Sequence, residues 1–127
     1  MSTLKKYTCF FVLLGTVLFA INAEEYTFDR NKDGKPDQWF EYEDGIAILE
    51  KRDRNFDGVI DYTAKFDNKN RKIYEEIDFN YDGQMDDFYY YEEGLLVLRK
   101  IVSNYDGQID IFIYITDGII YQSMRWI

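Results

Sequence analysis

Four Asp and Asn side chains lie within the nine residues "DFNYDGQMD", 78–86. Asp78, Asn80 and Asp82 stand at alternate positions, a glycine follows, and Asp86 ends the stretch. Carboxylate and amide oxygens are the ligands that Ca²⁺ takes, and glycine permits the sharp turn that a calcium loop needs. Asp and Asn also close turns without metal, because their side chains bond to their own backbone. The stretch therefore indicates either a cation site or a metal-free acidic turn.

The stretch occurs four times with a period of 24 or 25 residues. The copies are "DRNKDGKPD" (loop 1, 29–37), "DRNFDGVID" (loop 2, 53–61), "DFNYDGQMD" (loop 3, 78–86) and "VSNYDGQID" (loop 4, 102–110). Eleven of the 15 aspartates of the chain lie in these loops, so chance scattering does not explain them. A fixed period of this length predicts a repeat architecture, with units at about 29–52, 53–77, 78–101 and 102–127.

The segments between the loops are short, aromatic and β-branched, which is typical of strands. We expect strands at 37–43, 46–52, 60–66, 71–77, 85–91, 95–101, 109–115 and 119–125. A second turn signal, an Asp/Glu-Gly pair, divides three of the units, and "FDNKNR" takes its place in the second. The predicted fold is all-β: four tandem β-hairpins of about eight short antiparallel strands, joined by Asp-rich loops into an open curved sheet or repeat array.

The amino terminus has the features of a secretory signal peptide. Lys5 and Lys6 precede a short apolar run, and "INA" then leads into polar sequence, so we expect cleavage after Ala23. The run is shorter than the roughly 20 residues that span a bilayer, although an uncleaved anchor is the alternative reading. The prediction is an exported protein (secreted, periplasmic or on the cell surface) with a signal peptide at 1–23, one domain at 24–127 and no membrane span after cleavage.

The composition of residues 24–127 excludes several function classes. This part has 13 Lys and Arg against 24 Asp and Glu, a net charge of −11, which argues against nucleic acid and anionic membranes as partners. It has no Cys or His, so neither a thiol nucleophile nor an imidazole base is present. Glu75 and Glu76 are adjacent in an expected strand and would point to opposite faces, which disfavours a catalytic acid pair. We therefore expect no enzyme.

The motif D-x-N-x-D-G-x-x-D resembles the calcium loops of EF-hands, dockerins and thrombospondin type 3 repeats. The loop together with its hairpin is similar to the tandem EF-hand-like β-hairpin repeats of exported bacterial proteins. The resemblance implies side-chain ligands at loop positions one, three, five and nine and a backbone carbonyl at position seven. The implied ligands are Asp29, Asn31, Asp33, Lys35 and Asp37 in loop 1; Asp53, Asn55, Asp57, Val59 and Asp61 in loop 2; Asp78, Asn80, Asp82, Gln84 and Asp86 in loop 3; and Asn104, Asp106 and Asp110 in loop 4.

The loops depart from the EF-hand pattern at two places. The bidentate glutamate of position twelve is replaced by Phe40, Ala64, Tyr89 and Ile113, and loop 4 begins with Val102. Each loop then offers about five protein oxygens where Ca²⁺ takes six to eight, so water has to complete the shell. We expect up to four weak Ca²⁺ sites, with dissociation constants on the order of 10⁻⁴ to 10⁻³ M and loop 4 the weakest.

The predicted function is an exported calcium-binding repeat protein with a structural or interaction role. The alternative is a module that binds a surface glycan or a protein through a Tyr-rich face, with calcium only stabilising it or absent. The segment "DDFYYYEEG" favours this alternative, because Phe88, Tyr89, Tyr90 and Tyr91 put rings on both faces of one strand.

Overall fold

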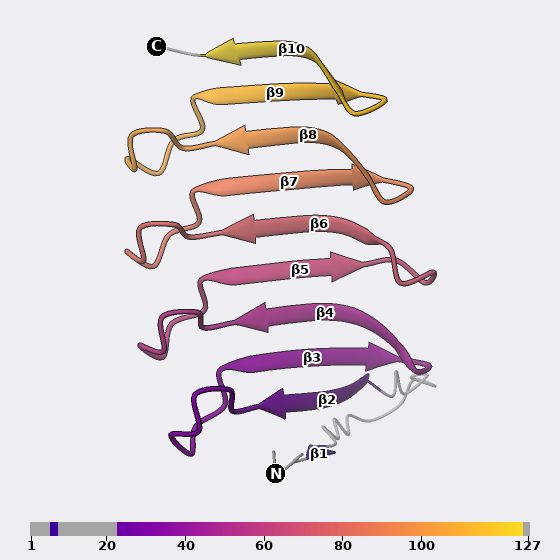
Figure 1. Cartoon of the computed structure of the whole chain (residues 1–127), viewed down its shortest axis with the longest axis vertical. Helices are drawn as coiled ribbons and strands as arrows, with labels where there is room; N and C mark the ends of the chain where they lie inside the picture. The colour runs from indigo at the N-terminus through magenta and orange to yellow at the C-terminus, as the bar shows by residue number, and fades with distance from the viewer. Residues whose placement is uncertain (1–5, 8–22, 126–127) are drawn as a thin grey trace, which may run out of the picture.

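A computed structural model describes residues 6–7 and 23–125 of the chain. They form one antiparallel sheet in which each strand pairs only with its neighbours in sequence, and the sheet is open (Figure 1). No helix lies within the described residues, and therefore none that could cross a membrane. Most of the predicted signal peptide lies outside the described residues.

The sheet has ten strands. They are β1 (Lys6–Tyr7), β2 (Ala23–Phe28), β3 (Gln38–Glu43), β4 (Ile46–Arg52), β5 (Tyr62–Phe66), β6 (Lys72–Ile77), β7 (Asp87–Glu92), β8 (Leu95–Ile101), β9 (Ile111–Thr116) and β10 (Ile119–Arg125). The all-β, antiparallel fold class is thereby confirmed, and the expected count of about eight strands was too low. The two additional strands, β1 and β2, precede loop 1.

Most differences between expected and observed strand bounds lie where a loop ends. Strands β4, β8 and β10 have the predicted bounds, whereas β3, β5, β7 and β9 begin one or two residues later than predicted. The ninth loop residue is held out of the strand because its backbone N–H donates back across the loop base, as Asp61 N does to the carbonyl of Arg52 at 3.0 Å. Asp37, Asp86 and Asp110 make the equivalent bond.

The tight turns lie at the ends of the strands that are away from the Asp-rich loops. Asp44–Gly45, Glu93–Gly94 and Asp117–Gly118 have positive φ at both residues, between 50° and 83°, as two-residue type I′ hairpin turns require. Between β5 and β6 the turn is longer, and its positive-φ residue is Asn70. There the Asp67 carboxylate accepts hydrogen bonds from the backbone of Lys69 and Arg71, both at 2.9 Å.

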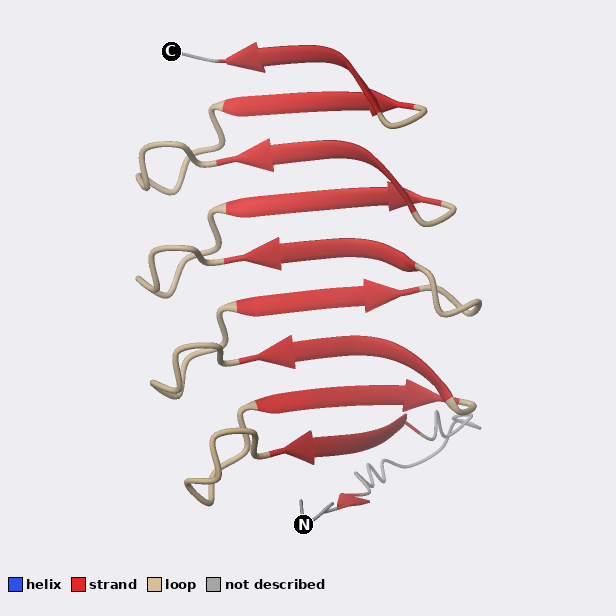
Figure 2. Ribbon diagram, in the orientation of Figure 1, coloured by secondary structure: helices blue, strands red, loops and turns tan. Residues whose placement is uncertain are grey.

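The sheet is a single layer (Figure 2). Among the described residues, only Ala64 and Val102 are buried hydrophobic side chains, and most buried residues are Asp, Glu, Gln or Thr. The fold is therefore stabilised mainly by cross-strand pairs on its two faces, rather than by a core between layers.

The fully buried Ala64 makes room for two carboxylates. In register it lies opposite Glu50 on β4 and Glu75 on β6, which are 5% and 9% exposed. Glu50 pairs with Arg52 at 2.5 Å, and Glu75 pairs with Lys72. Because a larger residue would displace both carboxylates from their cations, the sheet depends on alanine at this point.

All three tyrosines of the Tyr-rich segment have a cation over the ring. Arg99 lies 5.1 Å from the ring centroid of Tyr89, and Lys100 lies 4.6 Å from that of Tyr90. Tyr91 has Lys72 at 5.8 Å. Cation–π contacts of this kind stabilise a sheet face, and they also cover the surfaces on which a ligand would stack.

Candidate metal-binding loops

The four loops share one backbone curl. Position four has φ between 60° and 65°, and the glycine at position six has φ between 79° and 93°. The residues at position four are Lys32, Phe56, Tyr81 and Tyr105. Alternation between right- and left-handed conformations turns successive N–H groups toward one point and makes a concave anion site.

The first aspartate of the loop occupies this concave site itself. Asp29 accepts hydrogen bonds from the backbone N–H of Lys32 at 2.6 Å and of Gly34 at 2.8 Å. Asp53 and Asp78 accept the equivalent glycine N–H at 2.7 and 2.8 Å. Loop 4 has Val102 at this position, which is buried and has no carboxylate to offer.

The aspartate at position nine of each loop caps the start of that loop. Asp37 accepts the backbone N–H of Arg30 at 2.8 Å and of Asn31 at 3.1 Å through Oδ2. The equivalent bonds from position two are 2.7 Å to Asp61, 2.9 Å to Asp86 and 3.0 Å to Asp110. Together, the carboxylates at positions one and nine let each of the first three loops close without metal.

Positions three and five form an exposed amide–carboxylate pair. The Asn side chain donates to the Asp at distances between 2.8 and 3.1 Å. The pairs are Asn31–Asp33, Asn55–Asp57, Asn80–Asp82 and Asn104–Asp106. The residue at position seven donates its N–H to the same carboxylate, as Lys35, Val59 and Gln84 do at 2.8 to 2.9 Å.

The loops bring the predicted ligands of each site onto one short curl, and the donor set has the chemistry for Ca²⁺. As the loops stand, however, no three acidic side chains of the described residues are grouped closely enough to hold an ion. The carboxylates are turned toward backbone N–H groups instead. Calcium binding therefore requires the exposed pair at positions three and five to reorient.

Loop 3 has buried charge without a counter-charge. Asp78 is 1% exposed and Asp86 is 4% exposed, and neither makes an ion pair with a described residue. In loop 2, by contrast, Arg54 Nε lies 2.5 Å from Asp61 Oδ1. Since burying a carboxylate without an opposite charge is costly, loop 3 would gain more than loop 2 from a bound cation.

No protein-family model matches the chain, and no curated protein or solved structure matches it. The interpretation of the loops consequently depends on their own geometry.

Sequence reasoning missed the residues that join one loop to the next. Arg54 of loop 2 donates to the backbone carbonyl of Asp78 in loop 3 at 2.6 Å, and its guanidinium lies 5.3 Å from the Tyr81 ring centroid. The signal was an Arg at position two beside an aromatic residue at position four of the next loop. A contact 24 residues away could not be inferred from the spacing inside one loop.

Acid is expected to destabilise the loops. Hydrogen bonds from the backbone of Lys35 hold the pKa of Asp33 below its usual value, and those from Ser103 do the same for the pKa of Asp110. A lowered pKa stabilises the fold above the unfolded value of about 3.9, and this contribution is lost as pH falls through the folded value. Circular dichroism against pH should show stability falling only below about pH 4. Asp33→Asn should flatten this dependence, and an unchanged profile would contradict the assignment.

Replacement of Lys32 by glycine is expected to stabilise loop 1. Lys32 has φ 64°, a conformation that costs a side-chain-bearing residue about 1 kcal/mol and glycine almost nothing. Urea unfolding should give a gain of up to about 1 kcal/mol for Lys32→Gly. Tyr81→Gly is the matched comparison, since it relieves the same strain at φ 61° but removes the ring beside Arg54. A loss of stability in Lys32→Gly would contradict this expectation.

Proposed function

We propose that this protein is an exported calcium-binding repeat protein with a structural or interaction role. Its four hairpin units would each present one Asp-rich loop to Ca²⁺. The observation that carries the proposal is the buried pair Asp78 and Asp86, which has no counter-charge, below the exposed oxygens of Asn80 and Asp82. A divalent cation is the simplest group that would compensate this charge.

The side chains at positions one, three, five and nine and the backbone carbonyl at position seven would hold the ion, with water completing its shell. Weak binding follows from the small number of protein oxygens and from the hydrogen bonds that have to be exchanged. A site filled at ten times its dissociation constant stabilises the fold by about 1.4 kcal/mol. Several such sites would matter to a domain whose total stability is about 5–15 kcal/mol.

A structural role fits the position of the loops. They lie side by side at the same end of the strands (Figure 1), and each is joined to the next by a backbone hydrogen bond. These bonds join Asp53 N to the carbonyl of Asp37, Asp78 N to that of Asp61, and Val102 N to that of Asp86, at 2.7 to 2.9 Å. An ion that orders one loop would therefore also order its neighbours at that end of the strands. This would matter in a sheet that has few buried hydrophobic residues to stabilise it.

Titration calorimetry of the protein with Ca²⁺ after EDTA treatment tests the proposal directly. We expect weak binding at up to four sites, with one site lost in Asp82→Ala. Asp117→Asn removes a charge outside the loops, at a turn position that Asn tolerates, and should leave the stoichiometry unchanged. Absence of binding heat at millimolar Ca²⁺ would overturn the proposal.

Binding of a surface glycan or a protein is the second candidate function. Exposed aromatic rings favour the Asp-rich loops as its binding surface. Phe56, Tyr81 and Tyr105 are 49%, 44% and 52% exposed at the same position of successive loops. Rings of the Tyr-rich segment are half-buried and carry cations. Retention on a glycan array that is lost in Phe56→Ala would support this candidate. Silence on the array, together with strong calcium-dependent stability, would reject it.

A further inference from the structure

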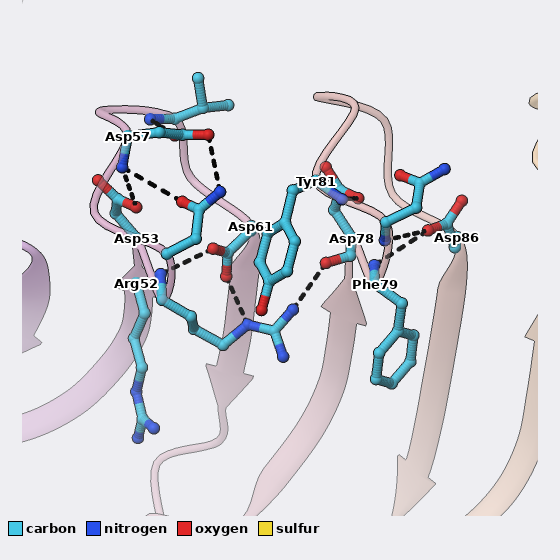
Figure 3. A network of polar contacts seen from close by, with 12 residues as sticks. Arg52, Asp53, Asp57, Asp61, Asp78, Phe79, Tyr81 and Asp86 are labelled. Atoms are coloured by element: carbon cyan, nitrogen blue, oxygen red, sulfur yellow. Dashed lines mark hydrogen bonds and ion pairs between the residues drawn. The ribbon is translucent and has the colours of Figure 1, made fainter.

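The junction between loops 2 and 3 is a receptor for a guanidinium group, and Arg54 fills it. Arg54 Nε donates to Asp61 Oδ1 at 2.5 Å, and a terminal nitrogen donates to the carbonyl of Asp78 at 2.6 Å. The rings of Tyr81 and Phe79 have their centroids 5.3 and 5.7 Å from the guanidinium carbon (Figure 3). A carboxylate, a carbonyl and aromatic faces match the flat, many-donor shape of this cation.

Most of the same parts stand one repeat earlier, between loops 1 and 2, where Arg54 takes the place of Phe79. Asp37 corresponds to Asp61, and Asp53 corresponds to Asp78. The backbone bond from the first aspartate of one loop to the ninth residue of the preceding loop is 2.9 Å at both junctions. Phe56 stands where Tyr81 does, with φ 65° against 61°. The frame of the receptor is therefore repeated.

At this earlier junction the carboxylate has a free oxygen. Asp37 is 4% exposed, and its Oδ1 is the one buried side-chain polar atom of the described residues without a hydrogen-bond partner. Asp37, Asp53 and Phe56 line a cavity of about 100 Å³ here. Arg30, the counterpart of Arg54, is exposed, and its side chain makes no hydrogen bond or ion pair with a described residue.

We propose that this cavity binds a guanidinium group. Asp37 Oδ1 accepts one N–H, the carbonyl of Asp53 accepts another, and the Phe56 ring covers the flat face of the cation. The guanidinium comes either from Arg30 of the same chain or from an arginine of a partner protein. The one free carboxylate oxygen makes a charge-assisted bond with such a donor. The site shares Asp37 and Asp53 with the calcium ligands proposed for loops 1 and 2, so its test is made without calcium.

Nuclear magnetic resonance of the full chain in EDTA tests both sources. If Arg30 is the occupant, its side-chain Nε–H should exchange slowly in the wild type and contact Phe56. In Arg30→Ala, added N-acetylarginine amide should then shift the Phe56 and Asp37 resonances, while N-acetyllysine amide should not. Shifts by arginine amide in the wild type as well would identify the site as open to a partner.

Two variants keep the result interpretable. Asp37→Asn preserves shape and the backbone caps but removes the charge, and should abolish the arginine shifts. Arg54→Ala empties the second receptor, so arginine amide should produce new shifts at Tyr81 and restore part of the lost stability. The proposal is overturned if Arg30 makes no contact in the wild type and arginine amide shifts nothing in Arg30→Ala. It is also overturned if lysine amide acts equally well.

Discussion

Several millimolar Ca²⁺ is expected to raise the thermal unfolding midpoint by more than about 10 °C above its value in EDTA. Three or four sites, each filled to about ten times its dissociation constant, add roughly 1.4 kcal/mol apiece. In a domain of this size, 1 kcal/mol moves the midpoint by about 4–8 °C. Differential scanning calorimetry in EDTA, Ca²⁺ and Mg²⁺ measures the effect, and Mg²⁺ should produce much less because it demands stricter geometry.

Asp33→Ala, Asp57→Ala and Asp82→Ala should each remove part of this calcium increment and change the midpoint in EDTA less. All three carboxylates are exposed. Asp117→Asn is the control outside the loops and should keep the full increment. A midpoint that is the same in EDTA and in Ca²⁺ would mean that the hydrogen bonds of Asp29, Asp37 and their counterparts are sufficient to hold the loops.

Alkaline unfolding between about pH 10 and 12 is the second large expected effect. Burial raises the pKa of Tyr89 to about 12, and burial likewise raises the pKa of Tyr62, Tyr74 and Tyr91. A raised pKa stabilises the fold fully below the unfolded value of about 10, and this contribution is lost as pH rises through the folded value. The phenol of Tyr62 donates to Glu75 at 2.8 Å, so its ionisation would place two negative charges together.

Far-ultraviolet circular dichroism and tyrosinate absorbance, followed in one pH titration, test this expectation. We expect exposed tyrosines such as Tyr105 to ionise first, and the half-buried phenols to ionise together with the loss of strand signal, because burial raises their pKa. Tyr62→Phe should move the transition to higher pH. Tyr105→Phe, at an exposed loop tip, should leave it in place. Complete tyrosine ionisation near pH 10 with intact strands would contradict the argument.

The hairpins and loops could be predicted because their signals are local. Strands β4, β8 and β10 follow an Asp-Gly or Glu-Gly turn, whose geometry fixes where the strand starts. The loops were found from their internal spacing. The placement of Glu75 and Glu76 on opposite faces also followed from strand alternation, and the register puts Tyr89 opposite the first and Phe88 opposite the second.

The remaining features depend on contacts between units. Ala64 is important because register places two carboxylates beside it, and no pattern within β5 reveals that. Arg54 is important because its guanidinium reaches the backbone of the next loop. Strand β2 was missed because Ala23–Phe28 directly follows the apolar amino-terminal run, which drew the prediction of a cleavage site instead. Local sequence signals predicted the strand hairpins, whereas the interactions between hairpins appear only in the structure.

The strictly sequential pairing of the strands has a mechanical consequence. Strands β2 and β10 lie at opposite ends of the described meander, and every ladder between them joins neighbours in sequence (Figure 1). Tension applied between β2 and β10 would act across the ladders and break their hydrogen bonds one after another, since no distant strand shares the load. The sheet should therefore lengthen in small steps at low force, with the Arg54 contact as a point of higher resistance between loops 2 and 3.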